Sequence, residues 1–426
     1  MAAILGSGHG LAAGTSITAK EASQYFQQAD ALTRADGGRL WGISLGGGLL
    51  LADPETRVAY ANQPDPQGRL MRVGPVLRGE ISTDVNLANT ALDWAGARWS
   101  MILVPLPEDR FVRATLIAHE LWHRVQDRLG LPSSAATNNH LDTRDGRYWL
   151  QLEWRALAAA LAAQGPDRAR AMTDAVLFRA QRRALFPQAA GQENGMEMHE
   201  GLAEYTGVRL SGAPDPARFV IDHELKDAPQ KESFVRSFAY ANGPAYGLLL
   251  DDTGSDWRKE VSPETDMGAL LLRRHGLTLP ADLQGTATRR APAYGATSLA
   301  AQEDARAEVR RKVNQDYRAR LVEGPLVKLP LRNMKIEFDP GNLVPLESLG
   351  TVYPHLRVVD DWGVLSVTEH GALISADFTQ VALPGPATVA SESITGEGWK
   401  LELKPGWSAD PGPRKGDLQL RRAPGR

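Results

Sequence analysis

Ala118-His119-Glu120-Leu121-Trp122-His123-Arg124 decides how the rest of the chain is interpreted, and it lies in a run from 113 to 129 that predicts a helix. Residues four apart on a helix share one face, so His119 and His123 present their imidazoles together, with Glu120 beside them. That arrangement is typical of a zinc site with a neighbouring proton acceptor. A catalytic zinc takes three protein ligands and keeps one position open, so one ligand remains to be found.

The composition is that of a globular protein of two or three domains. The chain has 426 residues, of which 42% are hydrophobic and 23% charged, enough to bury a sizeable core. A net charge of -3 gives no basic excess to neutralise phosphates, so we expect no nucleic acid partner. The absence of cysteine excludes disulfides, thiol nucleophiles and cysteine-ligated metal, so any metal must be held by histidine and carboxylate side chains.

No stretch of the sequence is suited to crossing a membrane, because no run of about 18 apolar residues occurs. The segment 1–14 is small and apolar but lacks a basic start, so it is a poor signal peptide. The sequence therefore predicts a soluble protein and leaves its compartment open, either cytoplasmic or exported with a trimmed or mis-started signal. It does not predict the oligomeric state.

The pattern of apolar residues predicts an α+β fold with an all-β end. A capping box at 18–21 opens a helix, and a small antiparallel sheet is predicted from short apolar runs at 39–52, 57–62 and 70–76. A further strand is predicted at 99–106. Helical patterns follow at 148–163, 166–185, 196–210, 234–250 and 304–322. The last segment consists of short alternating runs broken by turns, about 100 residues that predict a β module. The predicted parts are a helix at 1–36, a sheet-and-helix domain at 37–250, a helical extension at 251–325 and the all-β module at 326–426.

The third ligand must come from outside the helix that carries the two histidines. The spacing of a metzincin would place glycine at 126 and histidine at 129, but these positions hold glutamine and leucine, which excludes that class. His140 lies beyond the predicted helix end, where nothing fixes its distance from the motif, and a loop histidine is the commoner explanation. A carboxylate is the better candidate.

Two predicted helices offer such a carboxylate. In the segment 196–210, one face carries Glu200, Ala203, Glu204 and Gly207. The small residues allow close approach to a neighbouring helix, and Glu204 is placed to accept the second ring N–H of a metal-binding histidine. Glu153 borders an apolar stripe of the helix at 148–163, where pairing with arginine is commoner. We favour Glu200 as the third ligand and keep Glu153 as the alternative.

The segments His119–His123 and Glu200–Tyr205 together resemble the gluzincin zinc metallopeptidases. The closest likeness is to the aminopeptidase N and leukotriene A4 hydrolase branch, in which an Asn-Glu-Gly-Phe-Ala motif supplies the third ligand. The resemblance implies a zincin-like domain, with Glu200 as ligand and Glu204 as the residue that steadies a metal-bound histidine. Phe238–Gly243 resembles the Tyr-x-x-Gly segment that carries a transition-state tyrosine, which implies that role for Tyr240. The Gly-Ala-Met-Glu-Asn exopeptidase signature is missing, so the resemblance does not imply recognition of a free amino terminus.

The predicted site contains the groups needed for hydrolysis by a zinc-bound water. Zn²⁺ held by two imidazoles and one carboxylate lowers the pKa of bound water from about 15.7 toward about 7. Glu120 would accept the water's proton and pass it to the leaving amine, and Tyr240 would donate to the developing oxyanion. Tyr246 is the alternative for the tyrosine role, and simple packing would explain either residue. The strand at 99–106 is either a free sheet edge that holds an extended peptide or an interior strand.

These observations predict a zinc metallopeptidase that acts on a peptide or protein substrate. Two alternatives stay open: a zincin-fold binding or structural protein without turnover, whose working surface is the β module, and a hydrolase of a non-peptide substrate. The intact Glu120 favours catalysis, because a scaffold does not require the base. The sequence does not predict cleavage specificity, endo- or exo-action, or the role of 326–426.

Overall fold

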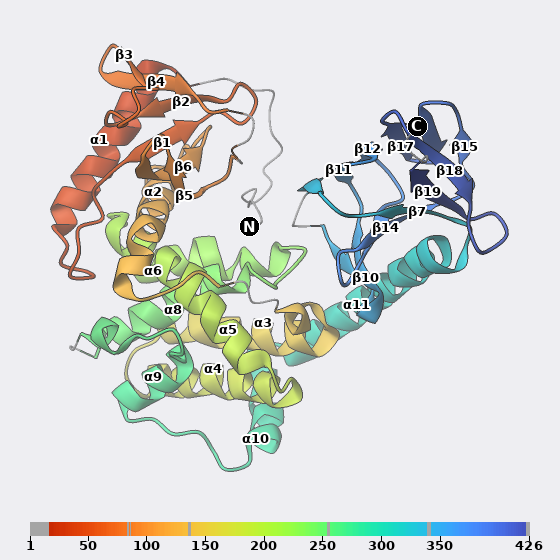
Figure 1. The fold of residues 1–426 in the computed structure, drawn as a ribbon. Coiled ribbons are helices and arrows are strands. Elements are labelled where there is room, and N and C mark those ends of the chain that lie inside the picture. Colours follow the sequence, from red (N-terminus) through yellow and green to blue (C-terminus); the bar gives the residue numbers. More distant parts are fainter. Residues whose placement is uncertain are drawn as a thin grey trace. The chain divides into compact units, whose positions relative to one another are not determined.

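The structure, a computed structural model, describes residues 17–82, 85, 87–134, 138–253, 256–338 and 342–422 (Figure 1). The chain forms two compact units, Met1–Glu303 and Asp304–Arg426. The helical extension expected at 251–325 is therefore divided between them. The segment 1–14, which we judged a poor signal peptide, lies outside the described residues. Within the described ranges, no helix is both long and apolar enough to cross a membrane.

The first unit begins with α1 (Ala19–Asp36), and the predicted capping box is present, since Thr18 and Glu21 each accept the other's backbone N–H. Six strands then form one sheet in the order β3-β4-β2-β1-β6-β5. Their bounds are β1 (Leu49–Ala52), β2 (Val58–Ala61), β3 (Met71–Val73), β4 (Val76–Glu80), β5 (Thr90–Trp94) and β6 (Ala97–Leu103). The strands from the runs at 39–52, 57–62 and 70–76 pair antiparallel, as predicted. The further strand at 99–106 joins the same sheet as β6, parallel to β1, so the sheet as a whole is mixed. A parallel partner is reached only through a long connection, here the chain that forms β2 to β5, and local patterns do not show such pairing.

Strand β6 is an interior strand, so the free edge considered for 99–106 does not exist there. It pairs with β1 on one side and β5 on the other, which makes β5 the edge of the sheet. Side chains of β6 enter two cores, with Ile102 packed among the helices and Trp99 and Met101 on the opposite face. Burial on both faces explains why this stretch reads as a nearly unbroken apolar run.

Helices make up the rest of the first unit and continue from the sheet through α2 (Figure 1), and the last of them, α11, runs on into the second unit. Their bounds are α2 (Arg110–Val125), α3 (Arg144–Ala162), α4 (Gly165–Leu185), α5 (Ala189–Met196), η3 (Glu197–Gly201), α6 (Leu202–Leu210), α7 (Pro216–Phe219), η4 (Val220–Leu225), α8 (Phe238–Asp251), α9 (Met267–His275), α10 (Leu283–Arg290) and α11 (Ala296–Arg318). Two glycines let three of them meet closely. A Cβ on Gly207 of α6 would lie 2.6 Å from the Thr115 carbonyl oxygen of α2, and one on Gly243 of α8 would lie 2.1 Å from the Gly201 carbonyl oxygen. These contacts hold α2, the η3–α6 segment and α8 together.

The second unit contains two sheets that pack over one shared core. The strand orders are β18-β19-β7-β14-β13-β10-β9 and β15-β16-β17-β12-β11-β8. The bounds are β7 (Leu326–Pro330), β8 (Lys335–Phe338), β9 (Val344–Pro345), β10 (Gly350–Tyr353), β11 (Leu356–Asp360), β12 (Gly363–Val367), β13 (Ala372–Ser375), β14 (Gln380–Pro384), β15 (Thr388–Val389), β16 (Ser393–Gly396), β17 (Trp399–Leu403), β18 (Trp407–Pro411) and β19 (Leu418–Arg422). Val327 and Ile374 from one sheet meet Val358 and Leu365 from the other. The chain is thus α+β with a sheet-rich C-terminal portion, to which η8 (Ala319–Glu323) also belongs.

Candidate metal centre

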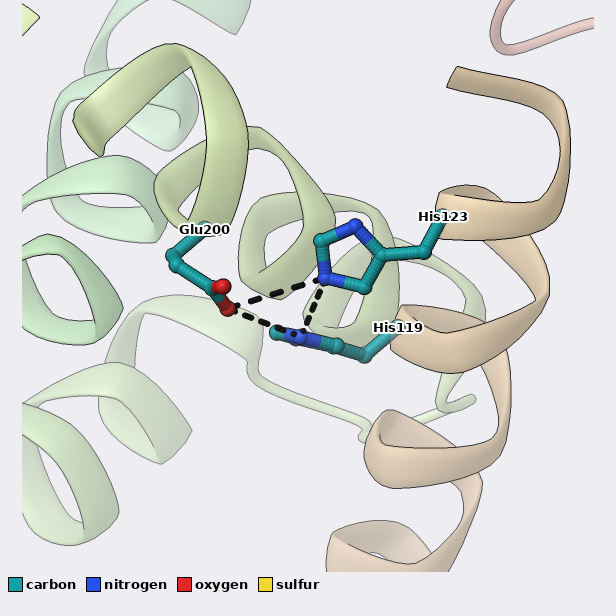
Figure 2. Close-up of side chains that lie close together, drawn as sticks. All are labelled: His119, His123 and Glu200. Atoms are coloured by element: carbon teal, nitrogen blue, oxygen red, sulfur yellow. Dashed lines mark hydrogen bonds and ion pairs between the residues drawn. The ribbon is translucent and has the colours of Figure 1, made fainter. Parts of the chain in front are cut away.

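Three side chains from two elements converge at one point of the first unit (Figure 2). His119 and His123 come from α2 and Glu200 comes from η3. The two Nε2 atoms lie 3.0 Å apart, and Glu200 Oε2 lies 3.3 Å from His119 Nε2 and 3.6 Å from His123 Nε2. His119 and Glu200 are buried, with exposed fractions of 3% and 1%. This convergence is the arrangement that the sequence predicted for a metal site.

The turn that carries Glu200 is π-helical, whereas the sequence pattern predicted regular α-helix there. The π turn spans η3, between α5 and α6. Glu197 at its start is held from behind, because Arg179 donates from two nitrogens to its two carboxylate oxygens at 2.6 Å each. Single π turns inside helices occur often at functional sites. Here the wider turn carries Glu200, which faces the His pair, while the next turn presents Glu204 to His119.

Hydrogen bonds on the far side of each imidazole fix which nitrogen carries the proton. His119 Nδ1 lies 2.7 Å from Glu204 Oε2, and His123 Nδ1 lies 2.9 Å from Gln126 Oε1. The orientation of the Gln126 amide is set by its Nε2, which donates to the Pro132 carbonyl at 3.2 Å. Since a carboxylate and an amide oxygen only accept, both Nδ1 atoms donate and both Nε2 atoms expose a lone pair.

With both Nδ1 protons directed away, three atoms that can bind a cation through a lone pair face one another: the two Nε2 atoms and one oxygen of Glu200. Such a group of neutral imidazole nitrogens and a carboxylate oxygen is complementary to a divalent cation, and two histidines with one glutamate are a ligand set that zinc uses in catalytic sites. The residues present fit zinc in number, type and tautomer.

The pKa values of the ligands show how strongly these groups interact. Burial alone would lower the pKa of His119, but its contacts with Glu200 and Glu204 raise that pKa well above the usual value. Burial would raise the pKa of Glu200, but the two imidazoles hold it well below its usual range. The low pKa of Glu200 favours its charged form, and a cation bound at this point would displace the proton that the raised pKa of His119 favours.

A second acidic residue, Glu224, lies next to Glu204. Burial and the charge of Glu204 raise the pKa of Glu224, on η4, well above its usual value. The raised pKa favours the protonated form of Glu224, which can donate a hydrogen bond to Glu204. The sequence analysis did not identify Glu224, because nothing in its local pattern distinguishes it from other acids.

Glu120 is the one carboxylate of the site without an assigned partner. Its side chain is buried, and its Oε2 has no hydrogen-bond partner among the described residues. Burial raises its pKa, while His119 and His123 act to lower it. A buried, unpaired carboxylate with a raised pKa next to the two histidines is suited to take a proton from water.

Tyr240, on α8, also belongs to the site. Its ring stacks on that of His119, with centroids 5.4 Å apart and an interplanar angle of 8°, and its hydroxyl donates to Glu200 Oε2 at 2.6 Å. Burial and the charge of Glu200 raise the pKa of Tyr240 well above its usual value, so the hydroxyl remains a donor. Arg236 donates to the other oxygen of Glu200. Each oxygen of the Glu200 carboxylate thus accepts a hydrogen bond, one from Arg236 and one from Tyr240, and these bonds fix its orientation.

Two further residues of the site were missed by the sequence analysis. His199 Nε2 lies 3.2 Å from Glu200 Oε1, and its Nδ1 lies 3.1 Å from Gln126 Oε1. Burial lowers the pKa of His199 to about 4, so its ring is neutral at pH 7. Gln126 lies three residues after His123, the spacing of neighbours on one helix face, and this is the signal that would have identified it.

The alternative ligands lie in a second buried group, which we call the ion-pair cluster: Glu153, Arg179, Arg182, Arg183, Glu193 and Glu197. Glu153 accepts from Arg182 and from Tyr246, and His140 Nε2 lies 2.8 Å from Glu193 Oε1. Glu153, His140 and Tyr246 are therefore committed to this cluster. The structure does not bring any of the three to the His119–His123 pair.

The chain was compared with models of known protein families, with curated proteins and with solved structures, and none of these comparisons found a match.

Proposed function

We propose that the chain is a zinc-dependent hydrolase that cleaves peptide bonds, with a zincin-like first unit related in its site to the gluzincins. The observation that carries the proposal is the meeting of two imidazole lone pairs and one carboxylate oxygen, beside the unpaired Glu120. When bound, zinc supplies a Lewis acid and lowers the pKa of a coordinated water. His119, His123 and Glu200 would hold it, and one position would remain for solvent or substrate.

The chain's own residues supply the proton transfers and part of the charge stabilisation. Glu120 takes a proton from the attacking water and passes it to the leaving amine, since its side chain is buried next to the two histidines and its Oε2 has no hydrogen-bond partner among the described residues. The raised pKa of Tyr240 favours its protonated form, and its ring lies against that of His119, so its hydroxyl would be a donor for the developing oxyanion. Glu204 and Gln126 orient the two imidazoles.

A peptide is favoured over a small molecule by a sheet edge that contacts the helix of the two histidines. Strand β5 is the edge strand next to β6, and it contacts α2, which carries both histidines. An extended peptide can pair with the unpaired N–H and C=O groups of an edge strand. Such pairing would hold the scissile bond near the metal by main-chain contacts, which small substrates cannot make.

The direct test is cleavage of a broad peptide library by zinc-loaded and zinc-free protein. We expect about one zinc per chain by elemental analysis, cleavage by the loaded form only, and loss of activity with a chelator that zinc restores. His119→Ala should lose both zinc and activity, whereas His355→Ala, an exposed histidine of the second unit, should lose neither. Zinc bound without any cleavage would contradict the peptidase and favour a binding protein.

A further inference from the structure

One sheet of the second unit has a face that is only partly covered. In β7, β14 and β13, alternate residues such as Val327, Val381 and Ile374 enter the shared core. The residues between them face the other way, and Leu321 of η8 packs over one end of this outer face with Leu326 and Leu373. The outer face is thus apolar near η8.

Beside η8 the outer face is hollowed into a cavity of about 310 Å³, which we call the η8 pocket. Its lining consists of Leu321, Val322, Leu326, Lys328, Leu349, Leu373, Ser375, Gln380, Ala382 and Arg414. Six of these residues are apolar, and the other four, Lys328, Ser375, Gln380 and Arg414, are polar or charged. The pocket is therefore amphipathic, and it lies entirely within the second unit.

Some polar groups of the η8 pocket already have hydrogen-bond partners within the chain, and others do not. Arg414 donates to Asp417 and to the Val322 and Gly324 carbonyls, so its side chain is held in place and lines one side of the pocket without a free donor assigned to a ligand. Ser375 donates to Asp377. By contrast, the Lys328 ammonium and the Gln380 side-chain amide make no hydrogen bond or close ion pair within the described part of the chain, although the charge of Lys328 contributes to the lowered pKa of the buried Asp417.

The two unused donors lie close to one another. Lys328 pairs with Ala382 across β7 and β14, and Gln380 is two residues along β14 on the same face. Lys328 and Gln380 are diagonal neighbours in the sheet, so their backbones lie about 7–8 Å apart. Both side chains are long, so one carboxylate can accept a hydrogen bond from each of them. Together they form a cationic and amide-lined end opposite the leucines of the pocket.

We propose that the η8 pocket binds a carboxylate attached to a short apolar body. At about 30 Å³ for each water-sized group, the cavity holds about ten non-hydrogen atoms, the size of octanoate. The carboxylate would bond Lys328 and Gln380, and the apolar body would lie on Leu321 and Leu373. A neutral ligand of the same shape is disfavoured, because covering the Lys328 ammonium without a partner costs its hydration. The site is independent of the metal centre and of the proposed hydrolase.

The test is calorimetric titration of the zinc-free full chain with octanoate, with octanol, and with N-acetyl-leucyl-leucine, which carries a peptide's C-terminal carboxylate. We expect at least one carboxylate to bind, with octanol at least tenfold weaker, and the tighter carboxylate identifies the source as a fatty acid or a peptide end. Lys328→Met, which keeps the aliphatic stem, should weaken binding at least tenfold. Lys335→Met, an exposed lysine of the other sheet, should leave binding unchanged.

A second variant tests the pocket itself and not only its charge. Ala382→Leu places extra methyl groups on the pocket floor and should abolish binding, with circular dichroism used to check folding. The proposal is overturned if neither carboxylate binds at millimolar concentration, if octanol binds as tightly as octanoate, or if Lys328→Met binds like the unaltered chain. The Lys328→Met result stands even if Ala382→Leu fails to fold.

Discussion

The metal centre and the ion-pair cluster are both buried and both built around glutamates, but they differ in how their negative charge is balanced. In the ion-pair cluster three carboxylates meet three guanidinium groups, with Arg182 between Glu153 and Glu193 and Arg179 on Glu197. In the metal centre Glu120, Glu200 and Glu204 share only Arg236 as a permanently charged partner among the described residues. A buried group that carries its own cations is complete, whereas one with excess acceptors needs a cation from outside.

The same contrast appears in the pKa values. Burial would lower the pKa of Arg182, but Glu153 and Glu193 raise it, and the pKa of Glu193 is well below its usual range although burial opposes this. Every charge there has a partner. At the metal centre the pKa of Glu120 is raised, chiefly by burial, because its neighbours do not compensate the loss of solvent. The first group stabilises the fold, and the second is available for chemistry.

The largest expected effect is on turnover. Glu120→Gln removes the proton acceptor without removing a ligand, so kcat should fall by about 10²–10⁴ while the zinc content stays near one per chain. Steady-state peptide hydrolysis and elemental analysis check both halves. Glu108→Gln, an exposed acid shortly before α2, is the matched control and should keep full activity. Full activity in Glu120→Gln would remove Glu120 from the mechanism.

The next prediction compares how variants in the ion-pair cluster and in the metal centre change the free energy of unfolding. Arg182→Met leaves Glu153 and Glu193 buried without their shared cation, and should lower the free energy of unfolding by about 3–5 kcal/mol. In the zinc-free chain, His123→Ala should change that free energy by about 1 kcal/mol or less, because it relieves a group of facing acceptors. Denaturant unfolding of the zinc-free proteins measures both. Equal losses would contradict the distinction between a complete and an incomplete charge group.

A smaller effect concerns the residue that orients His123. Gln126→Leu removes the acceptor for the Nδ1 proton, so either ring nitrogen can carry it and zinc affinity should fall about 10–100-fold. Competition with a chromophoric chelator gives the affinity. Asp127→Asn, at the next and exposed position, is the control and should bind zinc normally. If both variants bind zinc equally well, Gln126 has no orienting role.

The pH dependence should separate the zinc-free and zinc-loaded chains. The folded-state pKa of His119 is raised, so its contribution to stability is fully present below the usual histidine range and is lost as pH rises through the raised value. The zinc-free chain should therefore lose stability as pH rises above about 6.5. Zinc affinity should increase as pH rises, by up to about tenfold per pH unit for each proton that zinc displaces. Thermal unfolding across pH 6 to 9, with and without zinc, checks both signs, and stability that rises without zinc would contradict the account.

The sequence predicted those parts of the site that depend on a local repeat. His119, His123 and Glu120 follow from helix periodicity, and Gly207 was expected to allow the close approach of α6 to α2. Glu200 was favoured over Glu153, and the structure places Glu200 beside the His pair and Glu153 among arginines. The π turn was not predicted, because the spacing of apolar residues does not distinguish a single π turn from regular α-helix.

What the sequence could not predict depends on tertiary contacts. Gln126 acts as an acceptor because the Pro132 carbonyl holds its amide, and Glu224 matters only because η4 brings it to Glu204. The sheet was predicted from period-two runs, yet the parallel pairing of β1 with β6 and the edge position of β5 arise from a connection across four strands. Alternation shows that a strand is present and not which strand lies next to it.

The central claim is that His119, His123 and Glu200 hold one zinc ion between them. The most direct measurement is a crystal structure of the zinc-loaded chain with anomalous data collected at the zinc edge. The account predicts one strong peak, about 2.0–2.2 Å from the Nε2 atoms of both histidines and from a carboxylate oxygen of Glu200. A peak elsewhere, for example between His140 and Glu193, or no peak at all with zinc in excess, would contradict it.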